Sequence, residues 1–222
     1  MEITNTDFGT TIVDGIEYND YPPPAELIKA MERQWAVPLD QAGSIKMRKL
    51  AFYQCWEKRI LGDPEDGKGF LRFDGRLIHT GTVNDVYAWC TSLSSIQPSR
   101  LALIARDGGY DCLVRIREPS SFLARILSFL RQNYQGFRVH CGHVVYNRRA
   151  DVDKITLNSQ SWHFNVFQKA QESKDDEEYR ISIVNCTFNH LSGEDLDLEL
   201  GDCSDIITIE ELPDHTPDGI RR

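Results

Sequence analysis

The pattern of apolar and polar positions predicts a chain rich in short strands. Apolar and basic residues alternate over residues 43–50, as in a half-buried strand that carries Lys46 and Arg48 on one face. Several later runs are mostly apolar and have the length of a strand. We expect strands at 86–91, 110–117, 137–146 and 179–187, and edge strands at 196–200 and 206–209.

A hairpin is the clearest local feature. Residues 70–73 and 76–79 are both strand-like. The dipeptide Asp74-Gly75 between them tolerates the positive φ angles of a two-residue type I′ turn. The sequence therefore predicts two antiparallel strands joined by this turn.

Helical spacing and proline positions predict the helices. A helix that ends at Pro38 would place Leu27, Ile28, Met31 and Trp35 on one face. Further helices are expected at 51–61, 98–105, 119–132 and 162–171.

The order of these elements favours an α+β fold, because short helices are mixed with hairpin-linked strands. No repeat and no long Pro/Gly linker divides the chain. We therefore expect a single domain over residues 1–222, with a mainly antiparallel sheet and a few flanking short helices. Its core would cover about 22–187, and residues 188–222 would form an acidic C-terminal flank.

The charge is unevenly distributed. The chain has 25 Lys and Arg against 34 Asp and Glu, which gives a net charge of −9. Residues 1–150 carry a net charge of +2 and residues 151–222 a net charge of −11. Plain duplex DNA and anionic membranes are bound largely through basic groups, so we expect neither as a partner. The acidic third would aid solubility, bind a basic protein partner, or cover a basic cleft in the N-terminal part.

Localisation follows from what the sequence lacks. Its apolar stretches are too short to span a bilayer, and the first residues show no secretory signal. We expect a cytoplasmic protein.

The cysteines and histidines predict neither a disulfide framework nor a metal site. Six cysteines are scattered singly, which fits free thiols in the cytosol. His140 and His143 lie three apart in a predicted strand and would point to opposite faces. The cysteines are Cys55, Cys90, Cys112, Cys141, Cys186 and Cys203.

Four polar groups are candidates for chemistry. His79, at the end of the predicted hairpin, would help to bind a ribose or an amide, or simply belong to a hydrogen-bonded hairpin exit. Thr91 and Ser92 end an apolar strand, where hydroxyls orient a ligand or cap the next turn. Lys46 and Arg48 form a basic strand face, which is either a binding surface or a solvated one.

The fourth group is a pair of carboxylates. Asp176 and Glu178 are spaced by two, so they project to the same side if the strand has already begun. Such a pair fixes a sugar hydroxyl with one member and stabilises charge with the other. The alternative is a charged turn without a catalytic role, in which Glu178 pairs with Arg180, on the same strand face, or with a neighbouring lysine.

Short motifs in this order resemble a family of uncharacterised bacterial proteins found in mobile or phage-defence neighbourhoods. The order of a basic residue, a Ser/Thr-rich strand end and a late carboxylate pair is also similar to the arginine–serine–glutamate layout of ADP-ribosyltransferase folds. The motifs lie at 44–59, 63–67, 84–93, 110–116, 144–146, 167–169 and 178–180.

The resemblance implies a site for NAD. Lys46 or Arg48 would hold the phosphates, and Thr91 and Ser92 would support the nicotinamide-ribose pocket. Glu178 would hydrogen-bond the ribose and stabilise the developing oxocarbenium charge. Asp176 would select or activate the acceptor, although the family has Glu or Gln at that position. The competing hypothesis is a non-enzymatic interaction protein, such as an antitoxin, inhibitor or complex subunit, that uses its acidic C-terminal region against a basic partner.

Overall fold

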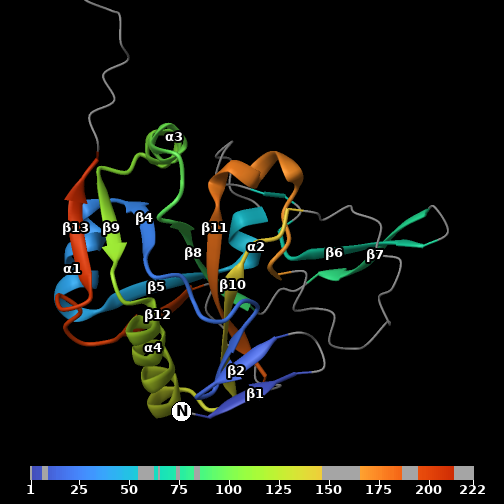
Figure 1. The fold of residues 1–222 in the computed structure, drawn as a ribbon, viewed down its shortest axis with the longest axis horizontal. Helices are drawn as coiled ribbons and strands as arrows, with labels where there is room; N and C mark the ends of the chain where they lie inside the picture. The colour runs from blue at the N-terminus through green and yellow to red at the C-terminus, as the bar shows by residue number, and fades with distance from the viewer. Residues whose placement is uncertain are drawn as a thin grey trace, which may run out of the picture.

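A large, mostly antiparallel sheet with helices against both of its faces dominates the fold (Figure 1). This confirms the helix-and-sheet character expected from the sequence. The computed structural model describes residues 2–6, 10–54, 63–64, 66–73, 76–82, 86–146, 166–186 and 195–212, and for 68–82 it describes the backbone alone.

The described strands form one sheet of eleven strands and a separate hairpin. The main path runs β1-β2-β3-β10-β11-β8-β4-β9-β13, and all its pairs are antiparallel except β3 with β10. The strands are β1 (Ile3–Asn5), β2 (Thr11–Val13), β3 (Ile16–Tyr18), β4 (Leu27–Met31), β5 (Ser44–Lys49), β6 (Lys68–Phe73), β7 (Arg76–Thr82), β8 (Val86–Leu93), β9 (Cys112–Ile116), β10 (Phe137–His143), β11 (Glu178–Asn185), β12 (Asp195–Glu199) and β13 (Ile207–Glu211).

The sheet forks at β8, and the fork positions the site. One edge of β8 pairs with β11 along its length. The other edge pairs with β5 at Tyr87 and Ala88, and with β4 at Ser92 and Leu93. Between these two stretches, β4 and β5 diverge from the same strand. β12 then pairs with the far edge of β5.

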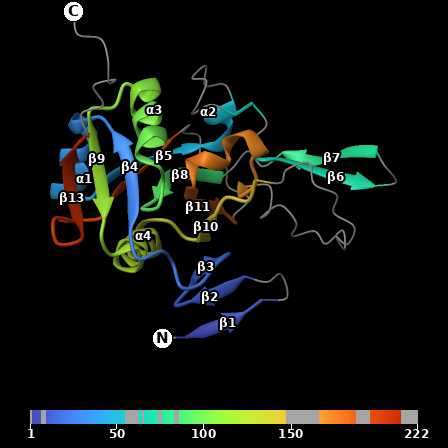
Figure 2. The same ribbon diagram turned by 45° about the horizontal axis from the view of Figure 1, so that its top comes forward.

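Helices cover the two faces of the sheet. They are α1 (Arg33–Ala42), α2 (Leu50–Gln54), α3 (Pro98–Gly108) and α4 (Pro119–Asn133), with a 3₁₀ helix, η1, at Gln171–Asp176. The apolar side of α4 packs against residues such as Ile181 on one face, whereas α3 packs against Ile28 and Ala30 on the other. Figure 2 shows α3 and α4 on opposite sides of β4. No helix in the described part of the chain is long and apolar enough to cross a membrane.

The predicted hairpin forms, with Phe73 opposite Arg76 in register. Its two strands, β6 and β7, extend to one side of the molecule, away from β13 (Figures 1 and 2). Residues 74 and 75, and with them the predicted turn type, lie outside the described residues.

Two predicted helices are wrong in position. The apolar run at 27–31 is the strand β4, because it is buried between β8 and β9. The helix starts later, at Arg33, passes through Pro38 and ends at Ala42, where it is capped by Gly43, whose φ of 62° is left-handed. Within the predicted helix 162–171, residues 162–165 lie outside the described part, and Gln168 forms an isolated bridge with Val145.

The buried core is also wider than 22–187. Val13 and Ile16 precede that range, and Leu198, Ile206 and Ile207 follow it, each no more than 7% exposed. The two late edge strands form as the sequence predicts: β12 pairs with β5, and β13 pairs with β9. Residues 195–212 of the acidic flank are therefore part of the folded core.

Candidate functional site

A cavity of about 380 Å³ lies at the fork in the sheet. The strands β4, β5 and β8 all contribute to its wall, together with α1, α2 and α3. Its apolar lining includes Trp35, Leu39, Trp89 and Ile104. Its volume falls in the range of small-molecule sites, which are typically apolar clefts with a few convergent polar groups.

Six of the seven sequence-predicted site residues line this one cavity. They come from β5, β8, η1 and β11, so the fold brings together segments that are far apart in the chain. The six are Lys46, Arg48, Thr91, Ser92, Asp176 and Glu178. The seventh, His79, is in β7, and its side chain lies outside what the structure describes.

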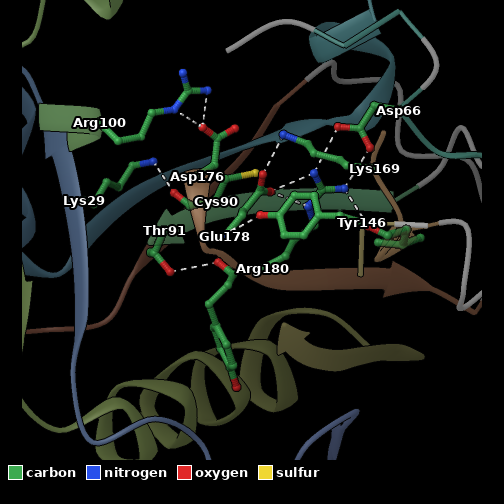
Figure 3. Close-up of polar contacts among 12 residues, drawn as sticks. Lys29, Asp66, Cys90, Thr91, Arg100, Tyr146, Lys169, Asp176, Glu178 and Arg180 are labelled. Carbon is green, nitrogen blue, oxygen red and sulfur yellow. Dashed lines mark hydrogen bonds and ion pairs between the residues drawn. The ribbon is translucent and has the colours of Figure 1, made fainter. Parts of the chain in front are cut away.

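Glu178 begins β11 and is enclosed by cations (Figure 3). Its carboxylate contacts the Lys169 ammonium at 2.6 Å and the Arg180 guanidinium at 2.8 Å. Burial alone would raise the pKa of Glu178, but Arg180 and Lys169 outweigh burial and hold that pKa far below its ordinary range. Glu178 is therefore a fixed, ionised carboxylate on the cavity wall.

Arg180 connects Glu178 to a second carboxylate. Strand alternation puts Arg180 on the same face as Glu178, as the sequence predicts, and the Arg180 side chain is fully buried. Its guanidinium donates to both oxygens of Asp66, at 2.8 and 3.1 Å, and to the Val166 carbonyl at 2.6 Å. The two carboxylates and two cations of this network pair with one another, so each buried charged group has a partner of opposite charge.

Asp176 reaches the cavity from η1. Glu177 has a left-handed φ of 43°, so the strand begins only at Glu178 and the spacing argument for a shared strand face does not hold. Asp176 nevertheless lines the same cavity, and Arg100 of α3 contacts its carboxylate at 2.5 Å. Burial raises the pKa of Asp176 in spite of Arg100. Asp176 is thus more readily protonated than Glu178.

The basic face of β5 is neutralised from within the chain. Lys46 and Arg48 lie on one face of the strand, as predicted, and β12 runs beside them. Arg48 contacts Asp195 at 3.1 Å, and Lys46 lies 3.6 Å from Asp195 and 3.9 Å from Asp197. Two carboxylates of β12, within the acidic C-terminal third, therefore pair with the basic residues of β5.

The hydroxyls at the end of β8 have different surroundings. Thr91 donates a hydrogen bond of 2.8 Å to the Tyr179 carbonyl of β11, so it joins the two strands. Ser92 is opposite Glu178 in the sheet register. Ser92 is therefore placed to share a ligand with Glu178.

The histidines have the geometry expected from their spacing. His140 is buried and its ring packs at 4.6 Å from that of Phe167, between ring centroids. His143 lies on the other side of β10, 5.4 Å from the ring of Tyr179. Cys90, Cys112, Cys141, Cys186 and Cys203 are free thiols, and Cys55 lies outside the described residues.

Lys29 and Lys169 belong to the site but were missed by sequence reasoning. Lys29 is in the misassigned strand β4, whereas Lys169 follows Gln168, which bridges Val145, in a region predicted to be helical. Both line the cavity. The only sequence signal was a basic residue next to apolar ones, which is too common to identify a site.

The comparisons with known proteins provide no relative. No protein-family model matches the chain, and neither a curated protein nor a solved structure matches it. The residues of the site are therefore the basis on which a function can be inferred.

Proposed function

We propose that the cavity at the fork binds NAD and that the chain is an ADP-ribosyltransferase-like enzyme. One observation carries the proposal: the residues that the family layout nominates, from three separate parts of the chain, line a single cavity. Scattered positions would have favoured a protein that only binds a partner. The convergence of a carboxylate pair, hydroxyls and cations on an apolar cleft favours a ligand site.

The proposed reaction replaces nicotinamide on the ribose by an acceptor. The bond between the ribose carbon and the nicotinamide nitrogen breaks, and its electron pair leaves with nicotinamide. A nucleophilic atom of the acceptor, or of water, then bonds to that carbon and releases a proton. Positive charge develops on the sugar in between, so a fixed negative group nearby lowers the barrier.

Glu178 and Asp176 fit different steps of this reaction. Glu178 is ionised and held by Lys169 and Arg180, so it can accept a ribose hydroxyl hydrogen bond and stabilise the sugar cation. Asp176 has a raised pKa, which suits it to accept the proton of the acceptor. Ser92, opposite Glu178, would contact the nicotinamide ribose.

The competing hypothesis of an acidic docking surface receives less support. Asp195 and Asp197 pair with Lys46 and Arg48, and Glu210 pairs with Arg115 at 2.7 Å. These carboxylates are already engaged inside the chain. A basic partner would have to displace those contacts.

Nicotinamide release and transfer of labelled ADP-ribose from NAD test the proposal. The wild type should turn NAD over, and Glu178→Gln should lower the rate by about 100-fold or more, since it removes the charge and keeps the shape. Glu172→Gln is the matched control, because Glu172 is in η1 and does not line the cavity. The assay is run at a temperature at which circular dichroism shows all three proteins folded. Absence of turnover in the wild type, together with absence of stabilisation by NAD, would refute the proposal and favour an interaction protein.

A further inference from the structure

The cations around the cavity differ in whether a carboxylate already neutralises them. Lys29, Lys46, Arg48 and Lys169 line the wall. Lys169 is paired with Glu178, and the two basic residues of β5 are paired with carboxylates of β12. Within the part of the chain that the structure describes, Lys29 has no carboxylate within ion-pair distance. It is the cavity cation that a ligand can neutralise.

The fork in the sheet explains the position of Lys29. On the edge of β8 away from β11, none of the described strands pairs with the stretch between Ala88 and Ser92, because β4 and β5 diverge there. The Lys29 ammonium donates to the Cys90 carbonyl on this edge at 2.6 Å. It also lies 5.0 Å from the centre of the Trp89 ring (Figure 3 shows Lys29 beside β8). One of its three N–H donors is thus used by a neutral acceptor.

An ammonium in such a place favours an anion. Burial lowers the pKa of Lys29, although Cys90 and Glu178 act against this effect. The side chain of Lys29 is partly buried, and a cation that is partly removed from water and lacks a counterion is costly, so an anionic ligand offsets that cost. Charge-assisted hydrogen bonds from such a group are also among the strongest that proteins form.

We infer that Lys29 is the anion subsite of the cavity and binds a phosphate group of the ligand, in place of Lys46 and Arg48. That Lys29 binds an anion is inferred from its position and contacts alone. Its assignment to a phosphate of NAD rests on the proposed function. The ligand would then extend from Lys29 along the open edge of β8 toward Ser92 and Glu178.

Calorimetric titration of the full chain with ADP-ribose and with inorganic pyrophosphate tests the inference. Lys29→Met keeps the length and the apolar stem of the side chain but removes the charge. Its affinity for both probes should fall by about 10-fold to 100-fold, the effect of one charged hydrogen bond. Lys174→Met is the matched control, and because Lys174 is exposed in η1 and does not line the cavity, the affinity of this variant should change by less than about 5-fold.

The outcomes separate this inference from the proposed function. If the wild type binds ADP-ribose and Lys29→Met binds it equally well, the inference is wrong and the NAD site stands. If the wild type binds pyrophosphate through Lys29 but neither ADP-ribose nor NAD, the inference stands and the proposed function is wrong. If the wild type binds none of these probes, both are wrong.

A second measurement on the wild type does not depend on how the variant folds. Acetic anhydride acetylates accessible lysines, and mass spectrometry measures the rate at each one. Saturating pyrophosphate should slow the acetylation of Lys29 by about 10-fold or more and leave Lys46 unchanged. Equal rates at Lys29 with and without pyrophosphate would contradict the inference.

Discussion

Glu178 is both buried and ionised, and both properties come from the cations around it. Lys169 and Arg180 compensate for the loss of water, and Asp66 in turn balances Arg180. The same contacts that hold the carboxylate in place also stabilise the fold. A substitution that removes its charge therefore affects stability as well as chemistry.

Glu178→Gln should destabilise the chain by about 3–5 kcal/mol at pH 7, because it leaves Lys169 and Arg180 without their shared counterion. If Glu178 lay on a solvated polar face, the same substitution would leave the melting temperature nearly unchanged. Urea unfolding followed by circular dichroism measures the difference. Equal stability of the two proteins would show that the network is not closed as described.

The difference in unfolding free energy between the wild type and Glu178→Gln should depend on pH, and the pKa of Glu178 sets the direction of this dependence. The pKa of Glu178 is lowered in the folded chain, so its ionised form stabilises the fold above the ordinary value of 4.5. This contribution is lost progressively as the pH falls below 4.5. The gap between wild type and Glu178→Gln should narrow by about 2 kcal/mol from pH 7 to pH 3. A gap that stays constant or widens on acidification would contradict the assignment.

Sequence reasoning found the site residues that local patterns reveal. The carboxylate cluster that contains Asp176 and Glu178 and the alternation of Lys46 and Arg48 are visible within a few residues of sequence. The strand face that the two carboxylates were expected to share does not form, because β11 begins only at Glu178. The Asp66–Arg180 pair joins residues 114 positions apart, and no local pattern encodes such a contact. The cations that make Glu178 a buried ion could therefore be identified only from the fold.

At the scale of elements, β4 shows where periodicity fails. Leu27, Ile28 and Met31 fit one face of a helix, but five residues are too few to separate a helix from a buried strand. Residues 27–31 form a strand because they pair with β8 and β9, and these two partners lie far from β4 in the sequence. The longer helices, such as α4, have enough turns for their apolar stripe to be recognised.

The strand β13 tests whether the acidic region is part of the core. Ile207 is 2% exposed and packs in the main core, whereas its neighbour Thr208 points to solvent. Ile207→Ala should cost about 2–5 kcal/mol in unfolding free energy. Thr208→Ala, the matched control, should change it by less than about 0.5 kcal/mol. If both variants melt like the wild type, the C-terminal region serves solubility alone.

At the scale of the whole molecule, the charges are uneven along the sequence, but acidic and basic residues lie next to each other at β5 and β12. The strand β12, from the acidic third, pairs with the basic strand β5. Asp195 and Asp197 therefore lower the positive potential at one rim of the cavity. Inside the site, Asp176 and Glu178 are paired with cations, whereas Lys29 has no carboxylate within ion-pair distance among the described residues. A ligand anion should therefore prefer the interior to the rim.

Removing the carboxylates of β12 should expose the basic rim. We expect Asp195→Asn with Asp197→Asn to raise the affinity for pyrophosphate by up to about 5-fold, because exposed ion pairs contribute little. The gain should disappear as added salt screens the rim. Weaker binding in the double variant, measured by calorimetry at low and high salt, would show that these carboxylates support the site instead of shielding it.

The most direct test of the central claim is a crystal structure of the full chain with ADP-ribose. We predict that the ligand occupies the fork between β4 and β5, with a phosphate oxygen within hydrogen-bond distance of the Lys29 ammonium and a ribose hydroxyl on the Glu178 carboxylate. A cavity that remains empty at a saturating ligand concentration, or ADP-ribose bound at another surface, would contradict the account.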